Sequence, residues 1–432
     1  MFFKKHPRGL MILFFTEMWE RFAFYTMLAV FTLFMDEVMG WSDSVKGDVY
    51  GIFLAGVYFT PIFGGWIADR LLGYRRTIMT GAVVFGLGYL LLSLSGPDAV
   101  WLFFMALAII IIGNGLFKAN ISVLVGNLYD EGSELKDAGY MIFYMGINLG
   151  ALMAPLVATF LHNKFGTYNA AFAAAAAGML LSLIVFELGK KKYLYAEQRQ
   201  KEDLARRVND TEYMNQQMSK EEEKERITAL MIIFAIVIFF WMSFHQNGFA
   251  LTLFAQRSVV ELEWLKPETY QFFNPFFIII LAPLVIRFFD RLRAKGKEPS
   301  TPAKIGLGMF ISGLAMMVMV VASLMGGNLD QNIMSPWWLI STYFIITIGE
   351  LHLSPMGLSF VSKVAPIRMR GLMMGFWFGA TAIGNYLSGF IGKFYSDLPH
   401  HMFFLILASL LFISALLVRL FLNKLKHATQ GV

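Results

Sequence analysis

The chain has 432 residues, of which 57% are hydrophobic, 16% aromatic and only 15% charged, and its mean hydropathy is +0.58. Because soluble domains carry about 25% charged residues, this composition excludes an ordinary cytosolic, fibrous or disordered protein and indicates a membrane protein. The sequence contains no cysteine, which excludes a disulfide framework, a thiolate metal site and a cysteine nucleophile.

Twelve stretches are long and apolar enough to cross a bilayer as helices, which requires about 20 residues each. They cover approximately residues 10–35, 48–68, 77–95, 100–126, 139–161, 168–188, 227–253, 270–289, 304–326, 336–362, 371–393 and 400–423. The sequence therefore predicts an all-α membrane protein with 12 transmembrane helices.

The basic residues set the orientation of these helices. If both termini and every second loop are cytoplasmic, 29 of the 36 Lys and Arg residues lie on that side and two lie within spans. The other five lie outside: Lys46, Lys164, Arg257, Lys266 and Lys393. Cytoplasmic loops of membrane proteins are enriched in Lys and Arg, so both termini are predicted to be cytoplasmic. The net charge of +6 then reflects topology, and no nucleic-acid partner is expected.

The spans form two groups of six around a charged stretch. Residues 189–226 hold 10 basic and 9 acidic residues and are predicted to form a solvated, partly helical cytoplasmic linker between an N-terminal bundle, 1–188, and a C-terminal bundle, 227–432. Two such halves are typical of a secondary transporter. A weak apolar stripe in the linker is formed by Leu204, Val208, Met214 and Met218.

Small residues at helical spacing predict close helix packing. They are the alanine-rich run 170–177 and the pairs Gly146 with Gly150 and Gly375 with Gly379. We interpret all of them as structural.

Ionisable residues inside spans are the strongest functional candidates, because each costs at least about 2.5 kcal/mol near the bilayer centre. Glu17, Glu20 and Arg21 lie at spacings of three and four in the first span, with Tyr25 one turn further on. These residues therefore share one face of the helix. The carboxylates outnumber the guanidinium, so a further cation or a proton is expected nearby.

Two more charges lie inside spans, in opposite halves of the chain. Lys118 lies in the fourth span, and Glu350 lies near the middle of the tenth, close to the helix-bending Pro355. The N-terminal half thus offers the cations Arg21 and Lys118, and the C-terminal half offers an anion. This polarity predicts a zwitterionic ligand whose carboxylate meets one half and whose ammonium meets the other.

His245 in the seventh span permits two interpretations. Histidine titrates near physiological pH, so His245 is a candidate proton carrier, and it is equally a candidate for a neutral, hydrogen-bonded structural residue.

Five motifs, in order along the chain, resemble those of the proton-dependent oligopeptide transporter (POT) family of the major facilitator superfamily. They are Thr16–Phe22, Gly64–Arg70 with Gly73–Arg76, Phe143–Gly150, Phe272–Pro275, and Gly349–Pro355 with Lys363–Pro366. The resemblance implies the major facilitator fold, with two six-helix bundles, and import of di- and tripeptides driven by the inward proton gradient. It implies a multi-pass protein of the plasma (inner) membrane, surrounded by lipid and working as a monomer without a cofactor or metal.

The resemblance also assigns roles to individual residues. Arg21 and Lys118 would bind the peptide carboxylate, and Glu350, with Asn274 and Asn148, would bind the amino group. The residues of the side-chain pockets would be Tyr25, Tyr58, Trp377 and Ser354. Glu17, Glu20 and His245 would take part in proton coupling. A conformational latch on the cytoplasmic face would consist of Asp69, Arg70, Arg75 and Arg76.

Three features depart from the family pattern. Leu28 stands where the family has an arginine, and His245 stands where it has a glutamate. The resemblance implies that this arginine and this glutamate form an ion pair in the family. This chain lacks both, whereas the loss of only one would leave a buried charge without its partner. The stretch 189–226 is also too polar for the two extra spanning helices found in many bacterial members.

Alternative functions remain open at this level. A same-family carrier of a nitrate-like anion would use Arg21 and Lys118 but gain little from Glu350, and a proton-coupled drug transporter would not need Lys118. The sequence contains no group of residues typical of a catalytic site, so no enzymatic activity is expected. It also shows no repeated pore residues typical of a channel.

Overall fold

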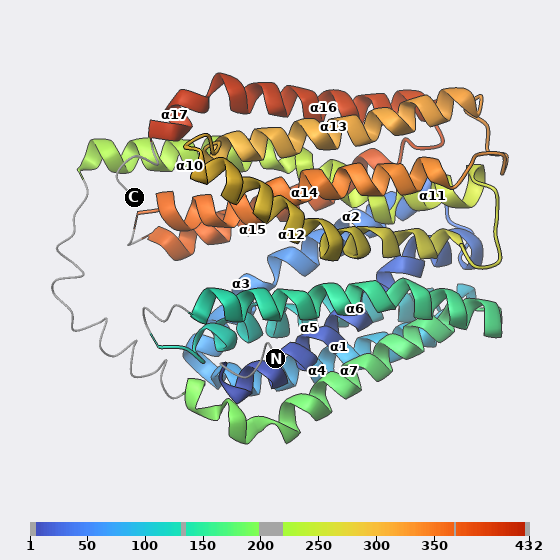
Figure 1. Ribbon diagram of the computed structural model, residues 1–432. Coiled ribbons are helices and arrows are strands. Elements are labelled where there is room, and N and C mark those ends of the chain that lie inside the picture. The colour runs from blue at the N-terminus through green and yellow to red at the C-terminus, as the bar shows by residue number, and fades with distance from the viewer. Residues whose placement is uncertain (1–5, 131–134, 198–218, 367–368, 428–432) are drawn as a thin grey trace. The chain divides into compact units, whose positions relative to one another are not determined.

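The computed structural model describes residues 6–130, 135–197, 219–366 and 369–427. In these ranges the chain is mostly helical, and its extended pairing is limited to two isolated bridges, Val259 with Met334 and Leu262 with Leu265. Figure 1 shows the long helices of each unit running side by side.

The contacts divide the chain into two compact units, Met1–Phe34 with Gly56–Gln217, and Met35–Ala55 with Met218–Val432. Unit 1 contains α1 (Arg8–Leu33), α3 (Pro61–Ile67), the π-helix η3 (Ala68–Leu72), α4 (Tyr74–Ser93), α5 (Val100–Gly126), α6 (Leu135–Phe165), α7 (Asn169–Leu188) and the 3-10 helix η5 (Lys190–Lys192). The contacts place α1 against α6 and α7, and α4 against α5 and α7.

Unit 2 is built from the later helices. They are α10 (Lys220–Phe244), the 3-10 helix η6 (His245–Gly248), α11 (Ala250–Ser258), the 3-10 helix η7 (Pro267–Phe272), α12 (Phe273–Ala294), α13 (Thr301–Met325), α14 (Trp337–Val364), α15 (Arg370–Gly392), α16 (His400–Leu420) and α17 (Leu422–His427). Within the unit, α13 packs on α14 and α16, and α10 packs on α15.

Each predicted span is occupied by a helix. Ten helical stretches are long and apolar enough to cross a membrane by length and composition, among the residues that the structure describes. The two other predicted spans, 10–35 and 371–393, are covered by α1 and α15. Helix α1 carries the charged residues Glu17, Glu20 and Arg21 within its apolar sequence.

One segment of the predicted N-terminal bundle groups with unit 2. The π-helix η2 (Phe34–Val38) and most of α2 (Asp43–Phe59) lie within or next to residues 35–55, which count with unit 2 by contacts. A glycine contact explains part of this grouping: a Cβ on Gly389 of α15 would lie 2.2 Å from the carbonyl oxygen of Gly47 and 2.4 Å from the nitrogen of Gly51. The backbones of α2 and α15 therefore touch directly.

The last part of the predicted linker, which is expected to be partly helical, is a helix. Helix α10 begins at Lys220, so residues 220–226 are helical. The side chain of Ser219 accepts a hydrogen bond from the nitrogen of Glu222, and three glutamates in the first turn favour the positive end of the helix dipole. The predicted apolar stripe Leu204, Val208, Met214 and Met218 lies outside the described residues.

The two predicted glycine pairs differ in outcome. A Cβ on Gly150 would lie 2.3 Å from the carbonyl oxygen of Met18, and one on Gly146 would lie 3.0 Å from that of Phe14, so α6 packs closely on α1 as predicted. Around Gly375 and Gly379 an added Cβ would meet nothing within 4 Å. The prediction of close packing is wrong for that second pair, because small residues define a smooth helix face without supplying a neighbour for it.

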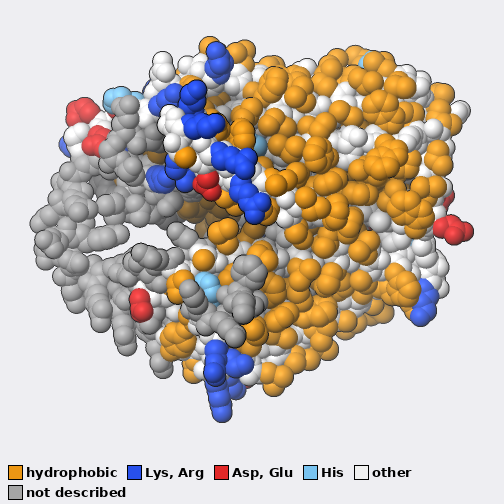
Figure 2. Space-filling model, viewed as in Figure 1, with side chains coloured by type: hydrophobic (Ala, Val, Ile, Leu, Met, Phe, Trp, Pro, Cys, Tyr) orange, Lys and Arg blue, Asp and Glu red, His pale blue; other side chains and the backbone are white. Residues whose placement is uncertain are grey.

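The surface matches a protein that lies in lipid. Many large apolar side chains are exposed, including Leu188, Trp101 and Leu420, with exposed fractions of 82%, 66% and 69%. Figure 2 shows hydrophobic side chains over most of the face in view, with Lys and Arg gathered toward its left side. This separation of apolar and basic surface is typical of membrane proteins.

Candidate functional site

The charged residues of α1 form a buried cluster in unit 1. The Nε atom of Arg21 donates a hydrogen bond to Oε1 of Glu17 at 2.8 Å and lies 2.7 Å from Oε2 of Glu20. All three side chains are at most 4% exposed. The close contact of Gly150 with the α1 backbone beside Arg21 fixes the helix that carries this cluster.

Lys118 of α5 is the second predicted cation. Its Nζ atom lies 3.9 Å from the centre of the Tyr58 ring, which is a favourable cation–π geometry. Lys118 also interacts electrostatically with Glu20 and Arg21. The structure thus brings Lys118 and Tyr58 together with the α1 cluster in unit 1.

Two asparagines hold the part of α5 that carries Lys118. The Nδ2 atom of Asn114 donates to the carbonyl of Val57 at 2.7 Å, and that of Asn120 donates to the carbonyl of Gly64 at 3.0 Å. Both amides are fully buried. These bonds to α2 and α3 position Lys118, and neither asparagine stands out in the sequence.

Two other predicted residues, Asn148 and Tyr25, also lie in unit 1. Asn148 of α6 is buried and donates to the carbonyl of Tyr144 in its own helix at 3.0 Å. Tyr25 is half-buried, contacts Phe24 edge-on and interacts electrostatically with Arg21. Of these two, the structure places Tyr25 beside the α1 cluster.

The predicted latch residues form contacts within unit 1. Tyr74 donates a hydrogen bond to Asp69, and Arg75 of α4 is paired with Glu187 of α7. Arg70 and Arg76 are exposed. Glu187, which the sequence analysis did not single out, joins α7 to this segment.

Two residues of the predicted amino-group site, Asn274 and Glu350, are in contact in unit 2. The Nδ2 atom of Asn274 on α12 donates to Oε2 of Glu350 on α14 at 2.8 Å and to Oγ1 of Thr347 at 3.1 Å. Asn274 and Glu350 are both half-buried. Thr347 lies one turn before Glu350, a spacing that could have identified it from sequence.

Three further predicted residues lie in unit 2. Ser354 lies one turn after Glu350 on α14 and is half-buried. Trp377 is only 2% exposed, with its ring packed on Gly357 and near Phe234. His245 is buried, and its ring stacks on that of Trp241 at 5.8 Å.

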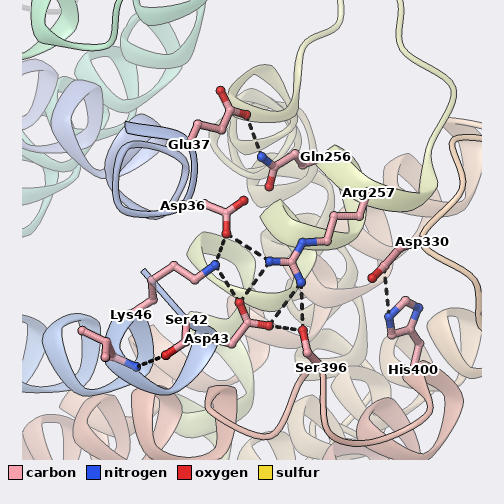
Figure 3. A network of polar contacts seen from close by, with 11 residues as sticks. Asp36, Glu37, Ser42, Asp43, Lys46, Gln256, Arg257, Asp330, Ser396 and His400 are labelled. Atoms are coloured by element: carbon pink, nitrogen blue, oxygen red, sulfur yellow. Dashed lines mark hydrogen bonds and ion pairs between the residues drawn. The ribbon is translucent and has the colours of Figure 1, made fainter. Parts of the chain in front are cut away.

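Sequence reasoning missed a second charged cluster in unit 2, shown in Figure 3. Lys46 of α2 pairs with Asp36 of η2 and, at 2.6 Å, with Asp43. Arg257 of α11 donates to both oxygens of Asp43 at 3.0 and 3.1 Å, to Asp36 at 3.1 Å and to Ser396 at 2.9 Å. Since Lys46 and Arg257 are predicted to lie outside, we call Asp36, Asp43, Lys46, Arg257 and Ser396 the outer network.

The outer network ties residues 35–55 to the rest of unit 2. Lys46 is fully buried and Asp43 is 8% exposed, so these charges are held away from water. Breaking one partner of a buried pair is costly, because the other charge is left uncompensated. Outside the network, Gln256 adds a hydrogen bond of 2.6 Å to Glu37, and Lys393 pairs with Asp48.

Comparison of the sequence with models of known protein families identifies the family of this chain. The family model described as POT family matches residues 75–213 and 195–407. The chain belongs to the POT family. The family resemblance of the sequence motifs is thereby confirmed.

Individual POT relatives cover nearly the whole chain. It is 31% identical to peptide transporter YePEPT of Yersinia enterocolitica, over 90% of this chain and 88% of that protein. It is 30% identical to dipeptide and tripeptide permease A of Salmonella typhimurium, over 90% of this chain and 84% of that protein.

Solved structures of POT transporters have the same fold. The structure of peptide transporter POT in complex with sulfate has a TM-score of 0.88 and 30% identity, covering 99% of this chain and 97% of that one. This similarity confirms the predicted all-α major facilitator fold, and the chain is therefore a multi-pass membrane transporter.

Proposed function

We propose that this POT transporter is a proton-coupled symporter that imports di- and tripeptides across the cell membrane by alternating access. The observation that carries the proposal is the separation of charge. Unit 1 holds the cations Arg21 and Lys118, and unit 2 holds the carboxylate of Glu350. Relatives named dipeptide and tripeptide permease support this choice of substrate.

The peptide carboxylate binds to Arg21 and Lys118 in this proposal. The Nε atom of Arg21 is used by Glu17 and Glu20, whereas Nη2 makes no hydrogen bond to the described residues. A guanidinium with spare donors is suited to a carboxylate. Lys118, held over the Tyr58 ring, adds a second positive charge.

The peptide amino group binds to Glu350. Asn274 donates to Oε2 of Glu350, which orients the carboxylate and leaves Oε1 available to an ammonium group. Asn148 and Asn274 supply further polar contacts, and Tyr25, Tyr58, Ser354 and Trp377 form the side-chain pockets. Because the transporter binds the two ends of the peptide, it discriminates little between peptide side chains.

Proton coupling is assigned to Glu17 and Glu20. Both carboxylates share the Nε atom of Arg21, so protonating one weakens its hold on the guanidinium. The peptide carboxylate then competes better for Arg21, which links proton and peptide binding. His245 is either an additional proton carrier or a neutral structural residue.

The remaining parts of the proposal concern the assembly. Contacts of Asp69 with Tyr74 and of Arg75 with Glu187 support a latch whose members include Arg70 and Arg76. The transporter works as a monomer in the inner membrane and needs no bound cofactor, because the proton gradient supplies the driving force.

A ligand-dependent stability screen tests the substrate class. A compound that binds the native state raises its apparent stability, so dipeptides, nitrate and cationic drugs are compared at equal concentration in detergent. Dipeptides are expected to raise the melting temperature and the others are not. A shift with nitrate alone would favour the anion carrier, which leaves the Asn274–Glu350 pair without a role.

A further inference from the structure

A histidine lies beside the outer network. His400 is the first residue of α16, and its side chain is 7% exposed. Its ring stacks on that of Tyr395, with the centres 4.9 Å apart and the planes 7° apart. Tyr395 directly precedes Ser396 of the outer network, and Figure 3 shows His400 in the same view as that network.

The polar contacts around the His400 ring favour its neutral form. The Nε2 atom lies 3.3 Å from Oδ1 of Asp330, so the tautomer with its proton on Nε2 meets an acceptor. The Nδ1 atom is buried and has no hydrogen-bond partner among the described residues. A second proton would place an N–H there without an acceptor, which disfavours protonation.

The surrounding charges do not reverse this preference. Asp330 attracts a protonated ring, but its side chain is 50% exposed and the attraction is screened. Arg257 repels the protonated ring, whereas the attraction of Asp43 is offset by its own pairs with Arg257 and Lys46.

The other neighbours add little charge. Phe254 of α11 contacts the ring edge-on, and the adjacent His401 is bound to Asn328 rather than to His400. The arrangement in which the His400 ring is buried therefore binds a proton on that ring less well than an arrangement in which the ring reaches water.

We propose that His400 is a proton-binding site that, when occupied, releases residues 35–55 from the rest of unit 2. The proposal rests on the proposed transport function. A proton that binds one arrangement less well shifts the population toward the other. Residues 35–55 continue at both ends into unit 1. A proton-driven importer requires that protons from the acid outer side favour such a release.

The test uses the natural absence of cysteine. Ser44 and Asp397 are exposed and line one cavity of about 360 Å³ beside the outer network. Ser44→Cys and Asp397→Cys together carry spin labels in lipid nanodiscs, and pulsed dipolar spectroscopy gives their distance distribution between pH 5 and pH 8 without peptide. The ratio of long to short distances is expected to rise on the order of tenfold toward pH 5.

Variants assign this change to one residue. His400→Gln and His400→Phe should flatten the pH response, and His400→Phe also keeps the aromatic stacking if glutamine disturbs folding. The matched control His401→Gln should retain the response, and Arg257→Gln should show long distances at every pH.

Two results would overturn the proposal. One is an unchanged pH response in both His400 variants, which would place the titration at another group. The other is a shift toward shorter distances at low pH. Because the measurement needs no peptide, its failure would leave the transport proposal standing, and absent transport would leave the distance response unaffected.

Discussion

Replacing Glu350 by Gln tests the proposed recognition of the peptide amino group. The substitution removes the negative charge but keeps an oxygen that accepts the 2.8 Å hydrogen bond from Asn274. A hydrogen bond to a charged group contributes about 1.5–3 kcal/mol. At about 1.4 kcal/mol per tenfold, the affinity for a peptide with a free amino group should fall by about 10-fold to 150-fold.

The assay compares two ligands on the same protein. Competition binding is measured with a dipeptide and with its N-acetylated form, which carries no ammonium and should lose little affinity. Glu261→Gln, which removes an exposed carboxylate of unit 2, is the control and should change neither ligand. Equal losses for both ligands in Glu350→Gln would refute the reasoning.

Three further predictions concern one residue each. Gly150→Ala should lower the melting temperature by several degrees, because its Cβ would lie 2.3 Å from a backbone oxygen of α1 and overpacking costs about 1–3 kcal/mol; Gly375→Ala, with open space around it, should not, and equal shifts would contradict the packing. Lys118→Gln should weaken binding of a dipeptide by about tenfold or more, as measured by competition binding. Binding of the same dipeptide with a C-terminal amide should be nearly unchanged, and an equal loss for the amide would show that Lys118 does not bind the carboxylate. Hydrogen bonds from Arg293 and Lys304 hold the pKa of Glu298 at about 2, so the stability it contributes is present above about pH 4.5 and is lost as pH falls toward 2. Glu298→Gln should therefore be less stable than the parent by under about 1 kcal/mol at neutral pH, with the difference vanishing near pH 2 in thermal unfolding; a constant difference would contradict the shifted pKa.

The sequence predicted the spans and the charges within them well for a physical reason. Apolar stretches of about 20 residues have few alternatives to crossing a bilayer as helices. Charges within them, such as Arg21, Lys118 and Glu350, are conspicuous because they are costly there. The pairing of Asn274 with Glu350 was available only through the family resemblance, because an asparagine in a span carries no such signal.

The outer network escaped prediction because its members are scattered. Asp36, Asp43 and Lys46 are more than 200 residues away from Arg257 and Ser396 in the sequence. Each lies near the end of a span, where a charge is ordinary and carries no functional signal. Only the folded chain shows that Arg257 binds both carboxylates.

One error had a local cause. The spacing of Gly375 and Gly379 predicted a packed face, and spacing alone does not say whether another helix lies against it.

The central claim is proton-driven peptide transport, and uptake by purified protein in liposomes tests it most directly. With an inward proton gradient, a radiolabelled dipeptide should accumulate above its external concentration, and a protonophore should abolish the accumulation. Absence of dipeptide uptake and of counterflow under any imposed gradient would contradict the account.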